Sequence, residues 1–154
     1  MPVSDYTPTV QIVADQIVSR TKDKYGNEIG TFNSNTRPTD TQVTRLIDEH
    51  IGDVANVIGS EIPQELWEDA QAVVAERVAM AIELTYFPEQ VNTDRSPYKM
   101  LKEQYEEDLA RLDKEVDVMA EGGDITEIST GPTNMPVGSF PDPTYPSLGF
   151  RTRW

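Results

Sequence analysis

The sequence contains no cysteine and only one histidine, His50. Without cysteine the chain can form no disulfide, thiolate nucleophile, cysteine-ligated zinc site or iron–sulfur cluster. A single histidine excludes a multi-histidine metal site within one subunit. No apolar run approaches the ~18 residues of a membrane span, and no signal-peptide core follows Met1. We therefore expect a protein that is made in a cytoplasm and has no contact with a membrane.

Basic residues are also scarce. The 154 residues include 27 acidic and 13 basic side chains, which give a net charge of −14 and an isoelectric point near 4.3. Residues 39–121 carry 20 of the acidic and seven of the basic side chains, so the acidity belongs to the middle of the chain. This balance disfavours a free-standing nucleic-acid-binding protein, because such a protein neutralises phosphates with Lys and Arg.

The middle of the chain has the pattern of helices. Thr39 and Gln42 form a Thr-x-x-Gln capping box, and apolar residues then follow at helical spacing until Gly59. This pattern predicts a helix over residues 40–58. Nearer the N-terminus, apolar residues at positions 10, 13, 14 and 17 predict a short amphipathic helix.

Two further helices are bounded by proline. Pro63 suits the first position of a helix that Pro88 ends. Ser96 and Pro97 suit the N-cap and the first position of a helix that Gly122-Gly123 ends. The sequence therefore predicts an all-α fold, a small bundle of three main helices with a short N-terminal helix.

The second of the three main helices is apolar on almost every side. Between Ala70 and Leu84 only four residues are polar. Such a helix must be covered on more than one side, and two partner helices in a small bundle leave part of it bare. We therefore expect a second subunit to cover the rest. The residues assigned to this inter-subunit surface are Val74, Arg77, Val78 and Ala81.

The flanks of the helical region differ from it. The turn residues Tyr25-Gly26-Asn27 predict a β-hairpin at about residues 20–32, inserted in a helical domain of residues 1–121. Residues 122–154 hold five Pro, five Gly and four aromatic residues, which is typical of an extended arm that becomes ordered on a partner. The residues expected to dock on a partner or on a neighbouring subunit are Phe140, Tyr145, Phe150, Arg151, Arg153 and Trp154.

No catalytic or cofactor-binding motif is present. We interpret His50 as a helix-surface or interface residue rather than a general base or metal ligand. The carboxylates of residues 103–108 have no second ligand-bearing segment, so we interpret them as a solvated helix face. Phosphate-loop and nucleophile-elbow motifs do not occur. The sequence thus predicts no enzyme, no cofactor and no metal site.

Arg95 lies in the link between the second and third main helices. It is one residue before the predicted cap Ser96. Two interpretations stay open: Arg95 is a surface arginine, or it is a tether that holds the link by pairing with Glu83 or Glu89.

Short stretches along the chain carry a resemblance to a known family. They are Arg20-Thr-Lys-Asp, Gly26-Asn-Glu, Gly30-Thr-Phe-Asn, Thr36-Arg-Pro-Thr, Gln42-Val, Glu83-Leu-Thr-Tyr-Phe-Pro-Glu-Gln and Asp94-Arg-Ser-Pro-Tyr. Together they resemble the head-to-tail adaptor (connector) proteins of long-tailed phages, and most closely those of phages that infect actinobacteria. The last two stretches are the most specific. The resemblance spans about residues 7–120 and leaves the arm unmatched.

The resemblance implies a small helical bundle that assembles as a twelve-subunit ring under the portal of the DNA-filled head. The ring would lead to the stopper or tail-terminator proteins, and packaged DNA would pass through its channel without specific binding. The protein would be a structural component of the head–tail neck of the virion, and it would be in the host cytoplasm during assembly. The family has no enzymatic activity and no cofactor.

Two other classes of function stay open. An acidic binding module, such as a DNA mimic that occupies a basic groove on a host protein, would act as a monomer or dimer and would need no aromatic arm. An enzyme whose site forms only between chains would need His50 or a pair of carboxylates to face a neighbouring subunit.

Overall fold

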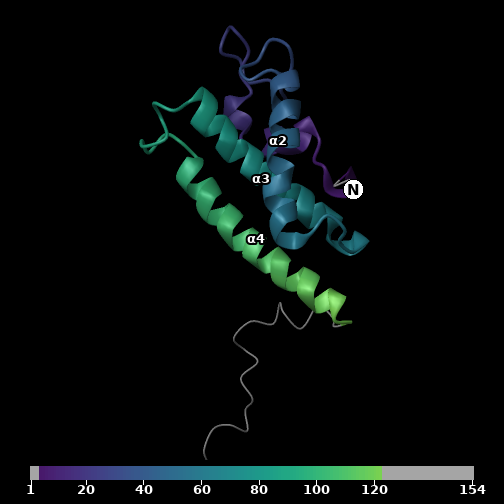
Figure 1. The fold of residues 1–154 in the computed structure, drawn as a ribbon. Coiled ribbons are helices and arrows are strands. Elements are labelled where there is room, and N and C mark those ends of the chain that lie inside the picture. Colours follow the sequence, from purple (N-terminus) through teal and green to yellow (C-terminus); the bar gives the residue numbers. More distant parts are fainter. Residues whose placement is uncertain (1–3, 123–154) are drawn as a thin grey trace, which may run out of the picture.

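The computed structural model describes residues 4–122. Their main helices are α2 (Asp40–Ile58), α3 (Trp67–Tyr86) and α4 (Tyr98–Ala120), and the short helix α1 (Val10–Gln16) precedes them (Figure 1). Single 3-10 turns lie at Ser4–Tyr6 (η1), Val18–Arg20 (η2) and Gln64–Leu66 (η3). The predicted all-α class is therefore confirmed.

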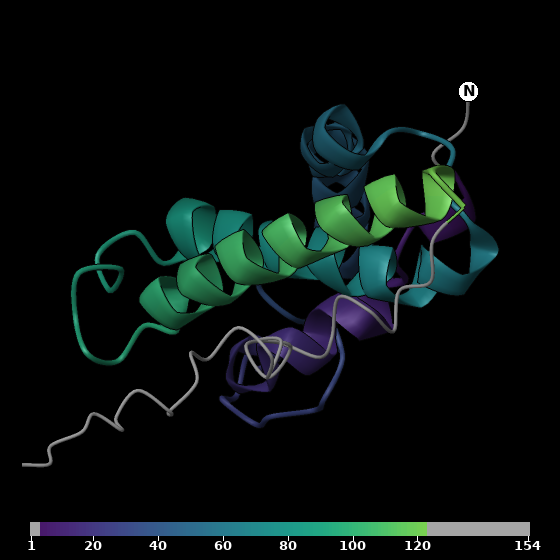
Figure 2. The same ribbon diagram turned by 90° about the horizontal axis from the view of Figure 1, so that it is seen from below.

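Helix α3 is the central element. It contacts α1, α2 and α4, and α4 lies along most of its length (Figures 1 and 2). Of its 20 residues, eleven are buried. They are Ala70, Val73, Val74, Ala75, Glu76, Val78, Ala79, Met80, Ala81, Ile82 and Glu83.

The expected cover of α3 by a second subunit is wrong for three of the four assigned residues. Val74 and Val78 are fully buried within one subunit, and Ala81 is 5% exposed. The reason is that α1 and η1 also pack against α3, so the helix has more partners in its own chain than the two helices considered from the sequence. These three residues therefore offer no surface to another copy.

The start of α2 agrees with the sequence. Thr39 has extended backbone angles, and its Oγ1 accepts a hydrogen bond from the backbone N–H of Gln42. The Gln42 side chain accepts one in return from the N–H of Thr39, at 2.9 Å. This confirms the capping box, which provides partners for N–H groups that the first turn of a helix leaves free.

The other two main helices begin later than predicted. Pro63 lies directly before the 3-10 turn η3, and α3 follows only at Trp67, whose indole N–H donates to the carbonyl of Ile62. Helix α4 begins at Tyr98 rather than Pro97, and the Tyr98 N–H donates to Oγ of the predicted cap Ser96.

The β-hairpin predicted at about residues 20–32 is wrong. Residues 4–122 contain no strand, and a single antiparallel bridge pairs Lys22 with Glu28. The chain before the bridge turns into η2, so it cannot continue as a strand. After the bridge, the hydroxyl of Thr21 takes the N–H of Gly30 that a longer ladder would need.

The docking arm predicted from the sequence lies outside this description. The arm residues Phe140, Tyr145, Phe150, Arg151, Arg153 and Trp154 all lie beyond the residues that the structure describes. Among the helices of residues 4–122, none combines the length and the hydropathy that crossing a membrane requires.

Candidate functional site

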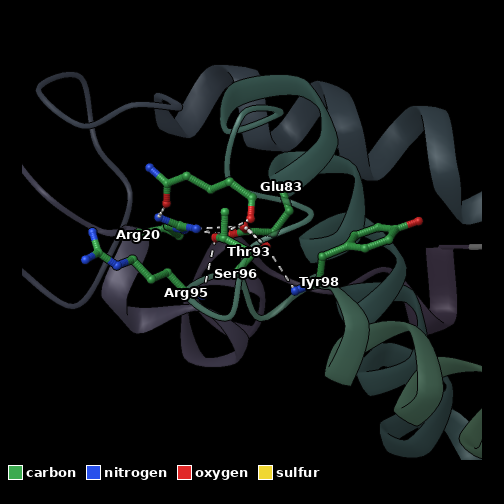
Figure 3. A network of polar contacts seen from close by, with 7 residues as sticks. Arg20, Glu83, Thr93, Arg95, Ser96 and Tyr98 are labelled. Carbon is green, nitrogen blue, oxygen red and sulfur yellow. Dashed lines mark hydrogen bonds and ion pairs between the residues drawn. The ribbon is translucent and has the colours of Figure 1, made fainter.

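The carboxylate of Glu83, in the last turn of α3, is buried and accepts three hydrogen bonds. The side chain is fully buried, and Arg20 at the end of η2 donates to it twice (Figure 3). The distances are 2.6 Å from Nε to Oε1 and 2.8 Å from Nη2 to Oε2. This two-pronged geometry gives short, charge-assisted hydrogen bonds, and a buried carboxylate needs such a partner.

The same two residues connect further parts of the chain. Arg20 also donates from Nη1 to Gln90 Oε1 at 3.0 Å, and its guanidinium lies 4.2 Å from the centre of the Phe87 ring. Ser96 donates to Glu83 Oε2 at 2.9 Å. We call Arg20, Glu83, Gln90 and Ser96 the clamp, because they join η2, the end of α3 and the start of α4.

Arg95 is not part of the clamp. Its side chain is exposed, and among the described residues it has no ion pair. In Figure 3 it extends away from Glu83, and only its backbone N–H donates to Thr93 Oγ1. The tether interpretation of Arg95 is therefore wrong. Among the described residues Arg95 pairs neither with Glu89 nor with Glu83, whose carboxylate Arg20 already occupies.

The role of Arg20 is not evident from the sequence. Arg20 and Glu83 are 63 residues apart, and helical periodicity contains no information on such a pair. One signal was available: Glu83 interrupts an almost continuous apolar helix, and an acid at such a position requires a basic partner. The sequence does not say which of the 13 basic residues supplies it.

A basic pocket of about 350 Å³ lies beside the clamp and is lined in part by Arg20 and Phe87. Three further lining residues, Lys22, Lys24 and Arg37, are exposed and make no ion pair with any residue of the described part. We use the term basic pocket for the hollow that these three side chains line. It is unusual in a chain of net charge −14.

Asp23 also lines the basic pocket, but its carboxylate is engaged within the turn. Oδ1 accepts hydrogen bonds from the backbone N–H groups of Tyr25 and Asn27, and Oδ2 accepts one from the Asn27 side chain. The hydrogen bonds from Asn27 and its neighbours hold the pKa of Asp23 below its usual value. Asp23 therefore stabilises the turn. Because its lowered pKa keeps the carboxylate ionised, it also contributes one negative charge beside the lysines.

A second buried acid lies between α3 and α4. Glu76 is 2% exposed, and its Oε1 accepts a hydrogen bond from Gln104 of α4 at 2.8 Å. Oε2 is buried without a partner among the described residues. Burial, and then the negative charge of Asp108, raise the pKa of Glu76 to about 7. In its protonated form Glu76 can donate to Asp108, which removes the repulsion between the two groups.

His50 lies in a polar cluster on the side of α2. Its Nδ1 is 3.1 Å from Asp53 Oδ2, and the same oxygen accepts a hydrogen bond from Arg77 Nε at 3.0 Å. Arg77, expected on an inter-subunit surface, instead pairs across to α2 of its own chain and is 24% exposed.

The described part of the chain offers little for catalysis. Within residues 4–122, no three His, Asp or Glu residues are grouped so that they could hold a metal ion. The Glu83 carboxylate accepts three hydrogen bonds and is closed to a substrate. The basic pocket is the feature best suited to bind another molecule, because it is open and its charges are unpaired.

No protein-family model matches this chain. Neither the curated proteins nor the solved structures include a significant match. The clamp and the basic pocket must therefore be interpreted from the residues of this chain.

Proposed function

We propose that this chain is a head-to-tail adaptor of a long-tailed phage, a structural protein of the virion neck without enzymatic activity. Twelve copies form a ring under the portal, around the DNA channel, and the ring leads to the stopper or tail-terminator proteins. The protein reaches this position from the host cytoplasm and has no contact with a membrane. We also propose that the helical bundle has the fold of that family.

The observation that carries this proposal is the composition of the clamp. Arg20, Glu83 with Gln90, and Ser96 belong to three separate stretches through which the sequence resembles the adaptor family. In the fold these stretches meet and share one set of hydrogen bonds. The resemblance therefore involves residues that depend on one another, which supports it more strongly than scattered matches would.

The acidity of the chain supports the same role. Each copy contributes a net charge of −14. Where such charge faces a channel, it repels the DNA backbone and leaves DNA no surface to which it can adhere. DNA would then pass through the ring without specific binding.

The burial of α3 changes how a ring would be built. Because Val74 and Val78 are covered by their own chain, contact between copies must use another surface. The ring itself is proposed from the resemblance, and the arm of residues 122–154 is proposed to dock on the portal or on a neighbour.

The decisive experiment combines the full chain with the portal protein of the same phage. Negative-stain electron microscopy and native mass spectrometry should show a ring of twelve copies attached to the portal. A stable monomer that ignores the portal and competes with DNA for a basic host protein would contradict the proposal. That result would favour the acidic DNA mimic.

A further inference from the structure

The two ends of the α2–α3 pair carry opposite charge. One end holds the basic pocket, with Lys22, Lys24 and Arg37 unpaired. The opposite end is acidic: no Lys or Arg occurs between Arg45 and Arg77. We call four exposed residues around η3 the acidic end. They are Glu61, Glu65, Glu68 and Asp69.

These opposite charges cannot neutralise each other within one copy. Arg37 shortly precedes α2 and Glu61 shortly follows it (Figure 1). The 19 residues of α2 separate the two ends by about 28 Å, whereas salt screens exposed charges beyond about 10 Å at 0.1 M. None of the acidic-end residues has an ion pair with another described residue. Both ends therefore present charge that is free for a partner.

Apolar side chains accompany the charges at both ends. In the turn that follows Lys22, Tyr25 is 76% exposed, with the Lys24 ammonium 5.0 Å from the centre of its ring, and Ile29 is 38% exposed. At the other end of α2, Val57 is 46% exposed. A few apolar groups surrounded by polar and charged ones are the usual composition of a protein–protein contact.

We propose that the basic pocket of one copy receives the acidic end of a second copy of this chain. We infer this occupant from charge complementarity, because the acidic end carries the charge opposite to that of the basic pocket. Glu65 and Glu68 lie on a turn and a helix, which hold them in fixed positions. The contact joins two different surfaces, so two copies in contact still have one free pocket and one free acidic end between them. Repetition of such a head-to-tail contact closes into a ring when the rotation allows it. The inference rests on the proposed function and names the surfaces that its ring would use.

A DNA backbone fits the basic pocket less well. Phosphates follow one another along a strand, and proteins that bind them present a stripe or face of basic residues. Here Arg20, Lys22, Lys24 and Arg37 line one hollow together with Asp23, and the chain as a whole has a net charge of −14. DNA binding is therefore an outcome that the test must be able to reveal.

The test measures association of the full chain by sedimentation velocity and native mass spectrometry at low and high salt. Lys22→Glu/Lys24→Glu should weaken association by about tenfold or more, and so should Glu65→Lys/Glu68→Lys. Mixing these two variants should restore association between unlike copies. The unchanged pocket of the second variant can receive the unchanged acidic end of the first, and the two reversed surfaces are complementary to each other. Matched controls on exposed positions of α4 are Lys99→Glu/Lys114→Glu and Glu103→Lys/Glu107→Lys, which should associate as the wild type does.

The outcomes separate this inference from the proposed function. If rings form and the Lys22/Lys24 variant assembles as well as its α4 control, the contact lies elsewhere and only the inference fails. If the wild type forms no ring alone or with the portal, both proposals fail. If the Lys22/Lys24 variant loses affinity for a DNA duplex in fluorescence anisotropy but keeps its self-association, the pocket binds phosphate and the inference is overturned.

Discussion

The buried carboxylate of Glu83 and the guanidinium of Arg20 form two parallel hydrogen bonds across 63 residues of sequence. The side chain of Arg20 is 12% exposed and that of Glu83 is fully buried, so water has little access to the pair and cannot replace its hydrogen bonds. Such a pair adds little net stability compared with apolar residues, but the loss of one partner leaves a buried charge uncompensated.

Arg20→Met should therefore destabilise the fold strongly. We expect a loss of about 3–5 kcal/mol in the free energy of unfolding, measured by urea titration. Arg45→Met is the control, because the Arg45–Glu49 pair on α2 is exposed, and it should cost less than about 1 kcal/mol. Equal losses in the two variants would show that the Arg20–Glu83 pair is not buried as described.

Glu76 should make stability depend on pH. Its pKa in the folded chain is about 7, above the ordinary 4.5, so the folded state keeps this proton when the unfolded state has released it. Stability should therefore fall as pH rises from about 4.5 to 7, and it should stay lower above that range. Glu76→Gln retains an acceptor for Gln104 and removes the titration.

We expect Glu76→Gln to match the wild type near pH 5 and to exceed it at pH 8 by on the order of 1–3 kcal/mol. Urea titrations at both values would measure the difference. Glu107→Gln, at an exposed position of α4, is the control and should leave the pH profile unchanged. A Glu76→Gln effect of the same size at both pH values would argue against a proton held by Glu76.

The capping box at the start of α2 can be tested by Thr39→Ala. The substitution removes the oxygen that accepts the N–H of Gln42, and we expect a loss of about 0.5–2 kcal/mol in thermal or urea unfolding. Thr41→Ala changes an exposed residue within the same turn and should be neutral or slightly stabilising. The capping interpretation would fail if both variants behaved alike.

Val78 tests whether α3 is covered by its own chain. Val78→Ala should lower the free energy of unfolding by about 2–3 kcal/mol, because it removes buried methyl groups and leaves a cavity. It should not change the association between copies in sedimentation velocity. Leu84→Ala is the control, since Leu84 is 46% exposed and should cost much less. Weaker association of the Val78 variant would indicate that α3 does take part in a contact between subunits.

The arm is tested by deletion of residues 131–154. We expect the truncated protein to keep its helical circular dichroism but to lose attachment to the portal. Replacement of Phe140, Tyr145, Phe150 and Trp154 by serine should have the same effect, because aromatic side chains supply most of the apolar area of such a docking segment. Thr133→Ala/Thr144→Ala is the control. Full attachment of the deletion variant would eliminate the arm as a docking element.

Local signals in the sequence predicted local structure well. The Thr39 capping box, the apolar period and the closing Gly59 together define α2, since each acts within a turn or two of the chain. The start of α3 was misplaced because Pro63 is not the first residue of a helix. With ψ of 143° it is extended, and it precedes the 3-10 turn η3 rather than α3. The predicted hairpin is wrong because a single bridge does not form a ladder of paired strands, and η2 ends the pairing on the N-terminal side.

Contacts between distant residues could not be predicted in the same way. The apolar character of α3 showed that the helix needed cover but not which element provides it, and α1 with η1 proved to be the missing partner. Likewise, the sequence showed an acid at position 83 and an arginine at position 20 without showing that they meet. Such pairs depend on how the chain folds back on itself, which no periodicity encodes.

The clamp also has a consequence for the motions of the protein. Because one carboxylate joins η2, the end of α3 and the start of α4, none of these segments can open without exposing an ionised group that has lost its partner. They should therefore open as one cooperative unit. Backbone amides near Thr21, Phe87 and Tyr98 should then exchange with deuterium at a shared, slow rate, although a single 3-10 turn and the ends of two helices would otherwise exchange quickly.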